Sequence, residues 1–435
     1  MNGQKNYFYK KNFQPQSIYI LNPNLIIIMV NDKKLFLASC FALITTAFSF
    51  SISAGTLKQL GTDLGYTAEN LGYINSLWFF GFPIAMIIGG LIYHSIGPKK
   101  IMQIAFVSHF VGAALTLYAI YVVTDASYAM LLVSNLLMGI GCGCTEAACN
   151  PMIADTYDGD KRNSMLNRFH MWFPGGIFLG ALISELMNTM GLSWQSQFWL
   201  IPIPALIYFF LFRGQAFPEP KGEQASLSAN FKAMLTPLFL FIFACMALTA
   251  ISEFGPQKWT GLIMESSGAK PMLILALTAG LMAVLRFFGG PVTKLLGQTG
   301  VLLGGAVLAT LGIYLFSTQI GSMTYVAAIF FALGVAFFWP TMIGFVAEKI
   351  PKSGALGMSI IGGVGMFSTA IFQPIIGGWI DSDIAEQSAL GLTGTELDLA
   401  AGQATLTTMM TFPIILIVAF VILFFWQKGS NKVAA

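Results

Sequence analysis

Residues 139–151 read GIGCGCTEAACNP, a stretch that places Glu146 in the middle of a long apolar run. A carboxylate at mid-membrane depth costs about 2.5–3.5 kcal/mol on insertion scales, so acidic residues are rare in membrane-spanning helices. Those that occur face the interior of a helix bundle or a water-filled cavity. The stretch therefore predicts a membrane-spanning helix with one polar face, buried among other helices.

The composition of the whole chain indicates a membrane protein. Its 435 residues are 56% hydrophobic and only 9% charged, whereas soluble domains carry about 25% charged residues. A water-soluble core cannot hide so much apolar surface, so we expect a multi-pass integral membrane protein with the lipid bilayer as its partner. The net charge of +3 gives no electrostatic basis for binding nucleic acid.

Apolar segments of the length that crosses a bilayer, about 20 residues, recur along the chain. We predict twelve transmembrane helices, at residues 35–57, 70–94, 101–123, 129–154, 165–188, 195–213, 234–257, 271–293, 299–318, 322–347, 354–380 and 404–427. The most hydrophilic divider, 214–233, is predicted to be a cytoplasmic linker between two bundles, 35–213 and 234–427. The expected fold class is an all-α membrane protein with two pseudo-symmetric six-helix bundles.

The two ends of the chain are predicted to be short cytoplasmic segments, residues 1–34 and 428–435. Residues 1–28 lack the long apolar region and the small-residue cleavage site of a signal peptide. Residues 29–34, MVNDKK, read like a natural start directly before the first span. We therefore interpret residues 1–28 as an upstream extension with no part in function.

The distribution of charge orients the predicted helices. If the N-terminus is cytoplasmic, most of the 22 Lys and Arg residues fall in inner segments, and the outer loops hold only Lys58, Lys258 and Lys270. Cytoplasmic loops carry the excess of positive charge, so we expect both termini to face the cytoplasm, in the cell (inner) membrane. Acidic residues cluster in the last outer segment, and we interpret them only as a solvated face: Asp381, Asp383, Glu386, Glu396 and Asp398.

A short pattern recurs after the second and the eighth predicted spans. Residues 90–97 read GLIYHSIG and residues 290–297 read GPVTKLLG, so two glycines and a polar residue keep the same spacing. The first copy supplies a loop motif: Gly90, His94, Gly97, Lys99 and Lys100. Glycines there would let two helices approach closely and let the backbone turn tightly. Two related halves are the plan of one large class of secondary transporters.

These features resemble the major facilitator superfamily and, within it, the fucose:proton symporter group, over about residues 35–427. The loop motif is similar to the superfamily's signature between helices two and three, with His94 in place of its acidic residue. The stretch EAACNP from Glu146 to Pro151 is similar to the group's Glu-Thr-Ala-Ala-Asn-Pro in helix four. Further similar stretches lie at residues 166–170, 253–259, 286–289, 339–341 and 362–381.

The resemblance implies a carrier that works by alternating access about a site at the bilayer midplane. It also shows departures from the group. An acidic residue of helix one, which takes part in proton coupling in the group, is matched here by Ala54, and the substrate-binding Gln of helix five is matched by His170. Substrate identity and coupling stoichiometry therefore do not carry over to this chain.

Glu146 and Asn150 are four residues apart, so both project from one face of a helix. If that face lines a cavity, Glu146 would bind the coupling ion, H⁺ or Na⁺, and Asn150 a substrate hydroxyl. The alternative is a structural carboxylate that is hydrogen-bonded to a neighbouring helix. We favour the coupling role and expect no other cofactor and no metal site.

Two more groups of residues are candidates for substrate binding. Asn167 and His170 share a face at the start of the predicted fifth span, where the alternative is an interfacial polar cluster. Glu253, Gln257 and Trp259 lie near the outer end of the predicted seventh span. They would form a gate or face a sugar, or else form a solvated helix end.

Arg286 is the clearest buried cation in the sequence, and an unpaired buried charge is costly. We expect it to pair with Glu253 or Glu146, or else to hold an anionic substrate. Trp339 and Gln373 each precede a proline inside a predicted span, where a broken helix would expose its backbone to a cavity. Trp339 is also a candidate platform for a sugar ring, although tryptophan is common at membrane interfaces.

No nucleotide-binding motif, Ser/His/Asp set or Cys/His metal cluster stands out, so we expect no enzyme. The favoured function is a monomeric secondary active transporter for a small polar substrate, foremost a monosaccharide or a sugar derivative, with H⁺ coupling. One alternative is an exporter or organic-anion carrier that uses buried Arg residues. An alternative of another class is a nutrient sensor that does not transport.

Overall fold

The computed structural model describes residues 31–122, 126–220 and 227–433, and within them it shows helices and no strand. The first half forms α1 (Asp32–Gly55), α2 (Leu57–Leu64), α3 (Ala68–Tyr121), α4 (Ser127–Thr156), α5 (Gly159–His170), α6 (Trp172–Thr189), the 3₁₀-helix η1 (Trp194–Leu200) and α7 (Pro202–Phe212). The expectation for residues 1–28 lies outside the described residues.

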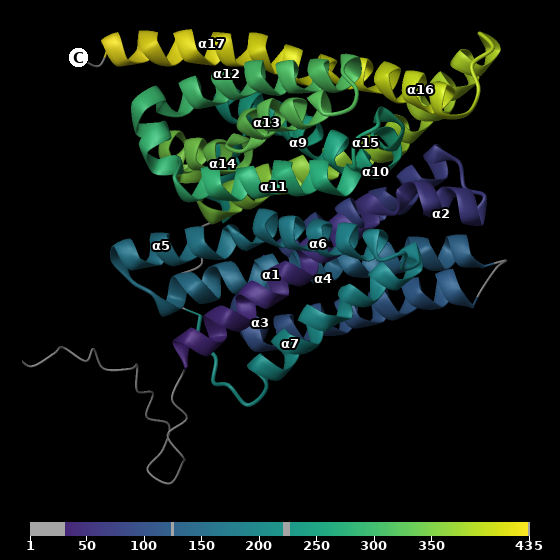
Figure 1. The fold of residues 1–435 in the computed structure, drawn as a ribbon. Helices are drawn as coiled ribbons and strands as arrows, with labels where there is room; N and C mark the ends of the chain where they lie inside the picture. The colour runs from purple at the N-terminus through teal and green to yellow at the C-terminus, as the bar shows by residue number, and fades with distance from the viewer. Residues whose placement is uncertain (1–30, 123–125, 221–226, 434–435) are drawn as a thin grey trace, which may run out of the picture.

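The second half continues the helical architecture and lies beside the first as a separate layer (Figure 1). It forms α8 (Leu227–Met234), α9 (Pro237–Lys258), α10 (Thr260–Ile263), η2 (Glu265–Ser267), α11 (Pro271–Phe287), α12 (Gly289–Thr318), α13 (Met323–Val335), α14 (Phe338–Lys349), η3 (Pro351–Ser353), α15 (Gly354–Ala389), α16 (Gly394–Met409) and α17 (Thr411–Val433). Helix α3 of the first layer runs along α15 of the second and α6 runs along α11, with smaller contacts from α1 to α9, α10 and α11, so these helices form the junction of the halves.

The helices have the length and composition of membrane spans. Within the described ranges, nine helical segments are long and apolar enough to cross a membrane, or ten if a bent pair counts as one span. That pair is Thr260–Ser267 with Pro271–Phe287, bent by 118°. The chain is therefore a multi-pass integral membrane protein. The 54-residue α3 counts once in this total, although it covers the second and third predicted spans.

Local sequence sets several helix ends. At the start of α3, the Thr67 side chain accepts a hydrogen bond from the Asn70 amide, and the Asn70 side chain accepts one from the Thr67 amide. This capping box satisfies backbone donors that a helix start leaves free. Gly65 ends α2 in the left-handed region, at φ 70°. Proline stands in the first turn of α7, α9 and α11, where its missing N–H costs nothing: Pro202, Pro237 and Pro271.

Gly97 and Gly297 break α3 and α12 at corresponding positions of the two halves. Their backbone angles nearly coincide, φ 77° and ψ 161° at Gly97 against φ 68° and ψ 164° at Gly297. Almost only glycine adopts this combination of φ and ψ, so the recurring pattern of the sequence encodes the same turn twice. Gly90 and Gly290 behave differently, because a Cβ on either would meet no atom within 4 Å. The expected close helix approach at these two positions is wrong.

Close helix contact occurs instead where α3 crosses α4. A Cβ on Gly139 would lie 2.2 Å from the carbonyl oxygen of Trp78, and one on Gly143 would lie 2.1 Å from that of Phe82. Such distances are far below van der Waals contact, so only glycine allows the two backbones to approach this closely. The glycines that precede Glu146 in the opening stretch therefore fix α4 against α3.

Several of the predicted spans are interrupted, among them the eighth at Phe288 and the twelfth at Met410. The fifth breaks at Met171, between α5 and α6, and the tenth breaks between α13 and α14, just before Trp339. A break near Trp339 was expected, and it falls at Ala336 and Phe337. The following proline, Pro340, stands in the first turn of α14. The comparable break expected at Gln373 is absent, because α15 continues as a helix through the proline that follows.

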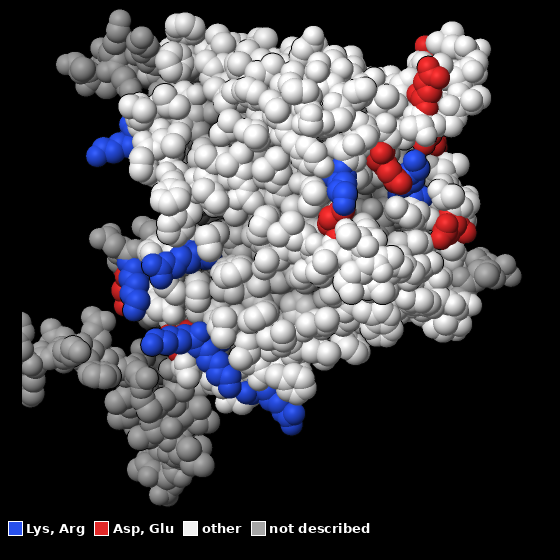
Figure 2. Space-filling view, in the orientation of Figure 1, with Lys and Arg blue, Asp and Glu red and all other residues white. Residues whose placement is uncertain are grey.

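The molecule has two distinct ends. We call the end formed by α2 and α10 the α2 end, and the opposite one, where α5 lies and α17 finishes, the α5 end (Figure 1). Lys and Arg gather at the α5 end, whereas Asp and Glu gather with a few Lys at the α2 end (Figure 2). His94, Lys99 and Lys100 of the loop motif are exposed.

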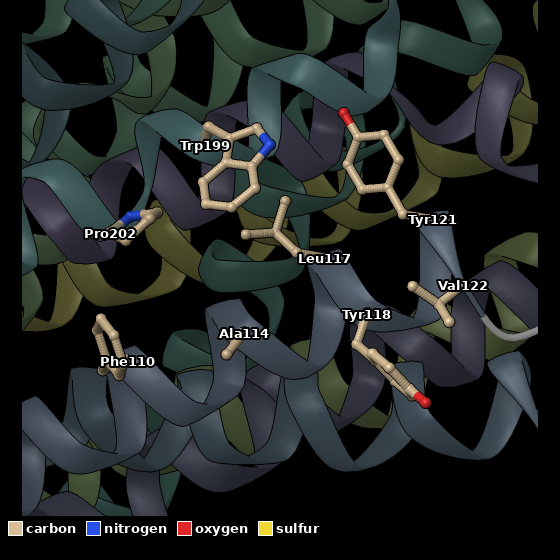
Figure 3. Close-up of a pocket in the computed structure, with 8 residues that line it drawn as sticks. All are labelled: Phe110, Ala114, Leu117, Tyr118, Tyr121, Val122, Trp199 and Pro202. Carbon is tan, nitrogen blue, oxygen red and sulfur yellow. The ribbon is translucent and has the colours of Figure 1, made fainter.

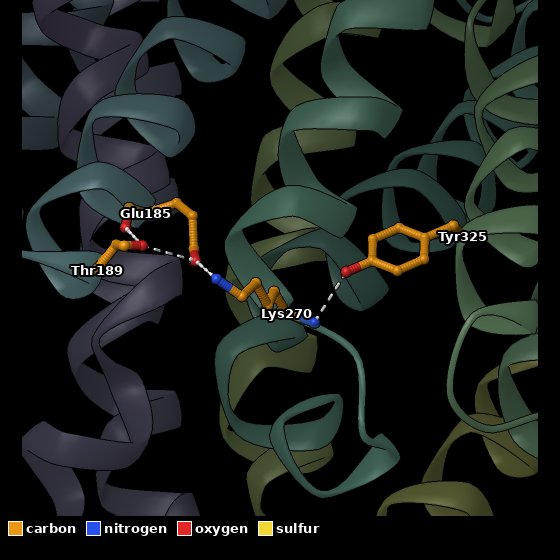
Figure 4. A network of polar contacts seen from close by, with 4 residues as sticks. All are labelled: Glu185, Thr189, Lys270 and Tyr325. Atoms are coloured by element: carbon orange, nitrogen blue, oxygen red, sulfur yellow. Dashed lines mark hydrogen bonds and ion pairs between the residues drawn. The ribbon is translucent and has the colours of Figure 1, made fainter.

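Polar contacts join the two halves at the α2 end. Lys58 Nζ lies 2.9 Å from Asp398 Oδ2, and Lys270 Nζ lies 2.6 Å from Glu185 Oε1 (Figure 4). Asp381 accepts hydrogen bonds from the first two amides of α3, at 2.9 and 2.8 Å. Within the described ranges, every hydrogen bond and ion pair between the halves lies at or just below this end. The halves are therefore closed against each other at the α2 end.

These contacts correct the interpretation of the last acidic segment as only a solvated face. Asp381 caps α3 from the opposite half, and Asp398 pairs with Lys58. Asp383 accepts a hydrogen bond from Thr405 at 2.6 Å within its own half. Three of the five acidic residues thus form tertiary contacts with residues of other helices.

Candidate functional site

Glu146 and Asn150 lie side by side in the interior part of α4. Asn150 Nδ2 donates to Glu146 Oε2 at 2.6 Å, and both residues are half-buried. No Lys or Arg of the described residues forms an ion pair with Glu146. The carbonyl oxygen Oδ1 of Asn150 is buried and has no hydrogen-bond partner. The pair therefore offers a carboxylate that can take up a proton and an acceptor that can bind a hydroxyl.

Glu146 and Asn150 continue a face of α4 that begins with Gly139 and Gly143. The spacing of four, three and four residues keeps all of them on one stripe of the helix. The two glycines bring this stripe onto α3. The two polar residues extend it from there toward the end of α4 that precedes α5. This explains how a carboxylate and an amide reach the interior of an apolar bundle.

Arg286 forms a buried ion pair with Glu253. Its Nη2 lies 3.1 Å from Glu253 Oε1, with 16% of the arginine side chain and 3% of the glutamate side chain exposed. Arg286 Nε also donates to the carbonyl oxygen of Ala336 at 2.8 Å. The structure thus brings Arg286 to Glu253 and not to Glu146. Its guanidinium is engaged by the protein itself, which leaves it poorly placed to hold an anionic substrate.

The break before α14 explains the second bond of Arg286. In a continuous helix the carbonyl of Ala336 would accept from the amide of residue 340, but Pro340 has no N–H. A buried carbonyl without a partner is costly, so a nearby donor stabilises the break. Arg286 supplies that donor from α11. One side chain therefore links α9, α11 and the α13–α14 break.

Glu253, Gln257 and Trp259 do not form a solvated helix end. Their exposed fractions are 2%, 3% and 0%. Gln257 Nε2 lies 3.7 Å from the sulfur of Met282, and the indole Nε1 of Trp259 has no hydrogen-bond partner. Trp259 belongs to the apolar core of the second half. It is therefore a packing residue in this conformation and not an accessible platform for a sugar ring.

Trp339 is half-buried beside an aromatic cluster that sequence analysis did not single out. The ring of Phe254 in α9 lies at the centre of this cluster. The centroids of the neighbouring rings lie 5.7 to 6.5 Å from the centroid of the Phe254 ring. These neighbours come from both halves: Phe50, Phe79, Phe173 and Trp339. The chain has 38 phenylalanines, so no sequence signal marks these few. The cluster fills the junction of the halves with apolar surface.

Other predicted residues remain apart from these groups. Asn167 and His170 are exposed on α5, and the hydrogen bonds of the described side chains include none to either. Gln373 is fully buried in α15, and neither polar atom of its side chain has a partner. The predicted substrate residues thus fall into separate places and do not form one continuous site.

Lys258 is a buried residue of the junction that sequence analysis missed, because it was assigned to an outer loop. That assignment is wrong, since α9 continues to Lys258 and the side chain is 0% exposed. Its Nζ donates to Ser53 Oγ at 2.9 Å, across the junction of the halves. A lysine at the end of an apolar segment ordinarily reaches water or headgroups. The sequence therefore gives no sign that the other half would cover it.

Two surface pockets lie away from these residues. The larger, about 740 Å³, is an apolar recess (Figure 3), lined by Phe110, Ala114, Leu117, Tyr118, Tyr121, Val122, Trp199 and Pro202. The second, about 240 Å³, opens between the halves at the α2 end, where Lys58, Asp381 and Asp398 line it. Neither is lined by a predicted substrate residue. The apolar recess lies on exposed aromatic side chains that suit contact with lipid.

Comparison with known proteins identifies the family. A model of the Major Facilitator Superfamily matches residues 39–270, more than half of the chain. Apolar helices that bury charged residues between them are typical of membrane transporters. On the family match, the chain belongs to the Major Facilitator Superfamily.

Curated relatives are distant. The "Probable anion transporter 1, chloroplastic" of Oryza sativa subsp. japonica is 22% identical over 183 residues, 41% of this chain and 33% of the relative. The "Multidrug resistance protein MdtL" of Escherichia coli O81 (strain ED1a) is 24% identical over 243 residues, 53% of this chain and 59% of the relative. The chain thus spans less than two thirds of the length of these relatives.

Solved structures show the same fold. A point mutant of the nucleoside transporter NupG superposes with a TM-score of 0.71 and 14% identity, covering 90% of this chain and 99% of the other. A D-xylose-proton symporter gives a TM-score of 0.65 and 14% identity, covering 87% and 97%. At such identities the likeness establishes the architecture alone.

Proposed function

We propose that the protein is a secondary active transporter that moves a small polar substrate, a monosaccharide or a sugar derivative, by H⁺-coupled alternating access. The observation that carries the proposal is Glu146, a half-buried carboxylate in an apolar helix without a cationic partner among the described residues. A charge that is retained at such a position is a functional site by default. The likeness of EAACNP to the helix-four stretch of the fucose:proton symporter group supports the same role.

In the proposed topology the chain has twelve spans, with α3 and α12 turning at Gly97 and Gly297. The two bundles rock about their junction, and both termini lie in the cytoplasm. The concentration of Lys and Arg at the α5 end supports a cytoplasmic α5 end (Figure 2). The α2 end is then the outer face, and the conformation described is closed toward the outside. We propose the cell (inner) membrane as its location.

Proton coupling follows from the chemistry of the pair in α4. Protonation neutralises Glu146 and converts one of its oxygens into a hydrogen-bond donor. Asn150, four residues further on, keeps its Oδ1 free for a substrate hydroxyl. A proton gradient supplies about 1.4 kcal/mol per pH unit for a neutral or an acidic sugar, and a membrane potential adds about 2.3 kcal/mol per 100 mV where one net charge moves.

The test compares uphill uptake with exchange in proteoliposomes that carry a proton gradient. Glu146→Gln should abolish uphill accumulation and leave counterflow of the same sugar measurable, since a permanently neutral side chain cannot exchange protons. Glu348→Gln is a suitable control, because Glu348 is exposed and pairs with the adjacent Lys349. Uphill uptake at the wild-type level in Glu146→Gln would refute the coupling role.

The alternatives from the sequence are weaker on this geometry. An organic-anion carrier with Arg286 as its clamp would have to break the ion pair to Glu253 and the bond to Ala336 first. A nutrient sensor without transport makes the opposite prediction in the same assay, because it binds ligand but gives no counterflow.

A further inference from the structure

Lys258 places a buried amine at the junction of the two halves. Its Nζ donates to Ser53 Oγ at 2.9 Å and to the carbonyl oxygen of Phe50 at 3.4 Å, both in α1 of the opposite half. The ammonium also lies 4.8 Å from the centre of the Phe50 ring. Among the described side chains, no carboxylate is within ion-pair distance of it. The protein thus surrounds this amine with neutral oxygens and supplies no carboxylate to it.

A chain of hydrogen bonds leads from this lysine to a buried amide with an unpartnered donor. Lys258 donates to Ser53 Oγ, and Ser53 Oγ donates to Asn75 Oδ1 at 3.5 Å, so the chain runs from α9 through α1 to α3. Asn75 is 0% exposed, and its Nδ2 donor has no acceptor. Gln373 in α15 is buried without any partner, and its backbone lies 2.5 Å from the position of a Cβ on Gly72, one turn before Asn75.

We propose that Lys258, Ser53 and Asn75 form a binding site for the carboxylate of the transported compound, which is therefore a sugar acid. This inference rests on the proposed function and specifies its substrate class. Buried charges in proteins are paired, and a buried donor without an acceptor is costly. The ammonium of Lys258 has no carboxylate partner among the described residues, and the amide N–H of Asn75 has no acceptor there. Together these two donors are complementary to a small anion.

The charge of the site selects a carboxylate over a phosphate. A lysine ammonium carries one positive charge, which a carboxylate balances and a phosphate dianion exceeds. Phosphate sites are also commonly built with the bidentate guanidinium of arginine. Arg286 and Arg168 do not take part here, since Arg286 is paired with Glu253 and Arg168 is exposed on α5.

The position of Lys258 also provides a route of access. Its hydrogen bonds cross from α9 of one half to α1 of the other, just below the contacts of the α2 end. When the halves separate at the α2 end, the ammonium leaves Ser53 and Phe50 and faces the space between the bundles. A carboxylate that enters there takes the place of these two oxygens as the partner of Lys258.

The experiment measures binding to the purified full-length protein by calorimetry and thermal shift at pH 7. The probes are D-glucuronate and D-galacturonate, each against its neutral counterpart, D-glucose or D-galactose, with inorganic phosphate as a further anion. We expect at least one uronate to bind 10-fold or more tightly than its neutral counterpart. Lys258→Gln should remove this difference, and Lys258→Arg should keep part of it. The matched control, Lys232→Gln, removes an exposed lysine of α8, away from the α2 end, and should leave the difference unchanged.

Several results would overturn the carboxylate site. They are no uronate binding, equal affinity for acid and neutral sugar, tighter binding of phosphate, or wild-type uronate affinity in Lys258→Gln. The comparison of acid with neutral sugar uses the wild-type protein, so it holds even where a Lys258 variant fails to fold. Failure of the proposed function is seen separately, as undiminished uphill uptake in Glu146→Gln, and leaves the binding result intact.

Discussion

Arg286 supplies the hydrogen-bond donor that Pro340 lacks. Pro340 has no N–H for the carbonyl of Ala336, and Arg286 Nε donates to that carbonyl at 2.8 Å from a different helix. The same guanidinium pairs with Glu253. The break in the tenth predicted span is thus not a local defect, because its stability depends on a side chain fifty residues before Ala336.

The first prediction concerns the loss of this arginine. Arg286→Gln should destabilise the protein by about 3–5 kcal/mol, because it leaves the carboxylate of Glu253 buried without a partner. The double variant with Glu253→Gln should lose less than the sum of the two single changes, since it removes both charges. Thermal unfolding in detergent measures both effects. Arg168→Gln, on exposed α5, is the control, and an Arg286→Gln protein that melts like the control would contradict the role of the pair.

The second prediction uses the two matched glycines. Gly97→Ala and Gly297→Ala should each cost about 1–3 kcal/mol, because a Cβ is strained at positive φ with extended ψ. Gly90→Ala and Gly290→Ala should be neutral or slightly stabilising, because these positions are helical and open. Melting temperatures of the four variants provide the test. Equal effects at Gly90 and Gly97 would show that the turn is not what requires glycine.

The third prediction concerns the cap that Asp381 places on α3. Asp381→Asn should weaken the closed α2 end by about 0.5–2 kcal/mol, since it removes a negative charge from a helix N-terminus. The fraction of molecules open at this end should rise. Distances between spin labels at Thr62 and Ser388, both exposed, would report the change. Glu386→Gln removes an exposed charge from the same helix end and should leave the distance distribution unchanged; an identical shift in both variants would refute the cap.

The fourth prediction follows from the ion pair between Lys270 and Glu185 (Figure 4). The hydrogen bond and the charge of Glu185 raise the pKa of Lys270 above its usual value. A raised pKa in the folded protein adds stability that is fully present below the pKa of the unfolded state. That stability is lost as the pH rises through the pKa of Lys270 in the folded protein. The melting temperatures of wild type and Lys270→Met should therefore differ by a constant amount from about pH 6 to 9 and converge at more alkaline pH.

The fold class was predictable because a bilayer imposes apolar segments of defined length and glycine or proline at their breaks. The positions of Gly97 and Gly297 follow from the repeated pattern, and the break near Trp339 follows from Pro340. Where the halves meet was not predictable. Asp381 and Lys258 contact residues that are hundreds of positions away, and nothing in their own neighbourhood indicates the partner.

The candidate site was predictable in its types of residue but not in its pairing. Hydropathy alone identifies Glu146, Glu253 and Arg286 as polar residues in apolar spans. The sequence leaves open which carboxylate pairs with Arg286, since the choice depends on how α9 and α11 pack. The structure places Glu253 beside it and leaves Glu146 without a cation among the described residues. The proposed coupling role of Glu146 depends on that choice.

The polar contacts at the α2 end also have a kinetic meaning. A solute that arrives from that side can bind only to molecules in which these contacts are broken, so its apparent affinity is the intrinsic one reduced by the fraction of such molecules. In the proposed transporter, a solute that arrives from the α5 side does not carry this penalty. The uneven distribution of contacts between the two ends would then make the half-saturating concentrations on opposite sides of the membrane unequal, even for a single binding site.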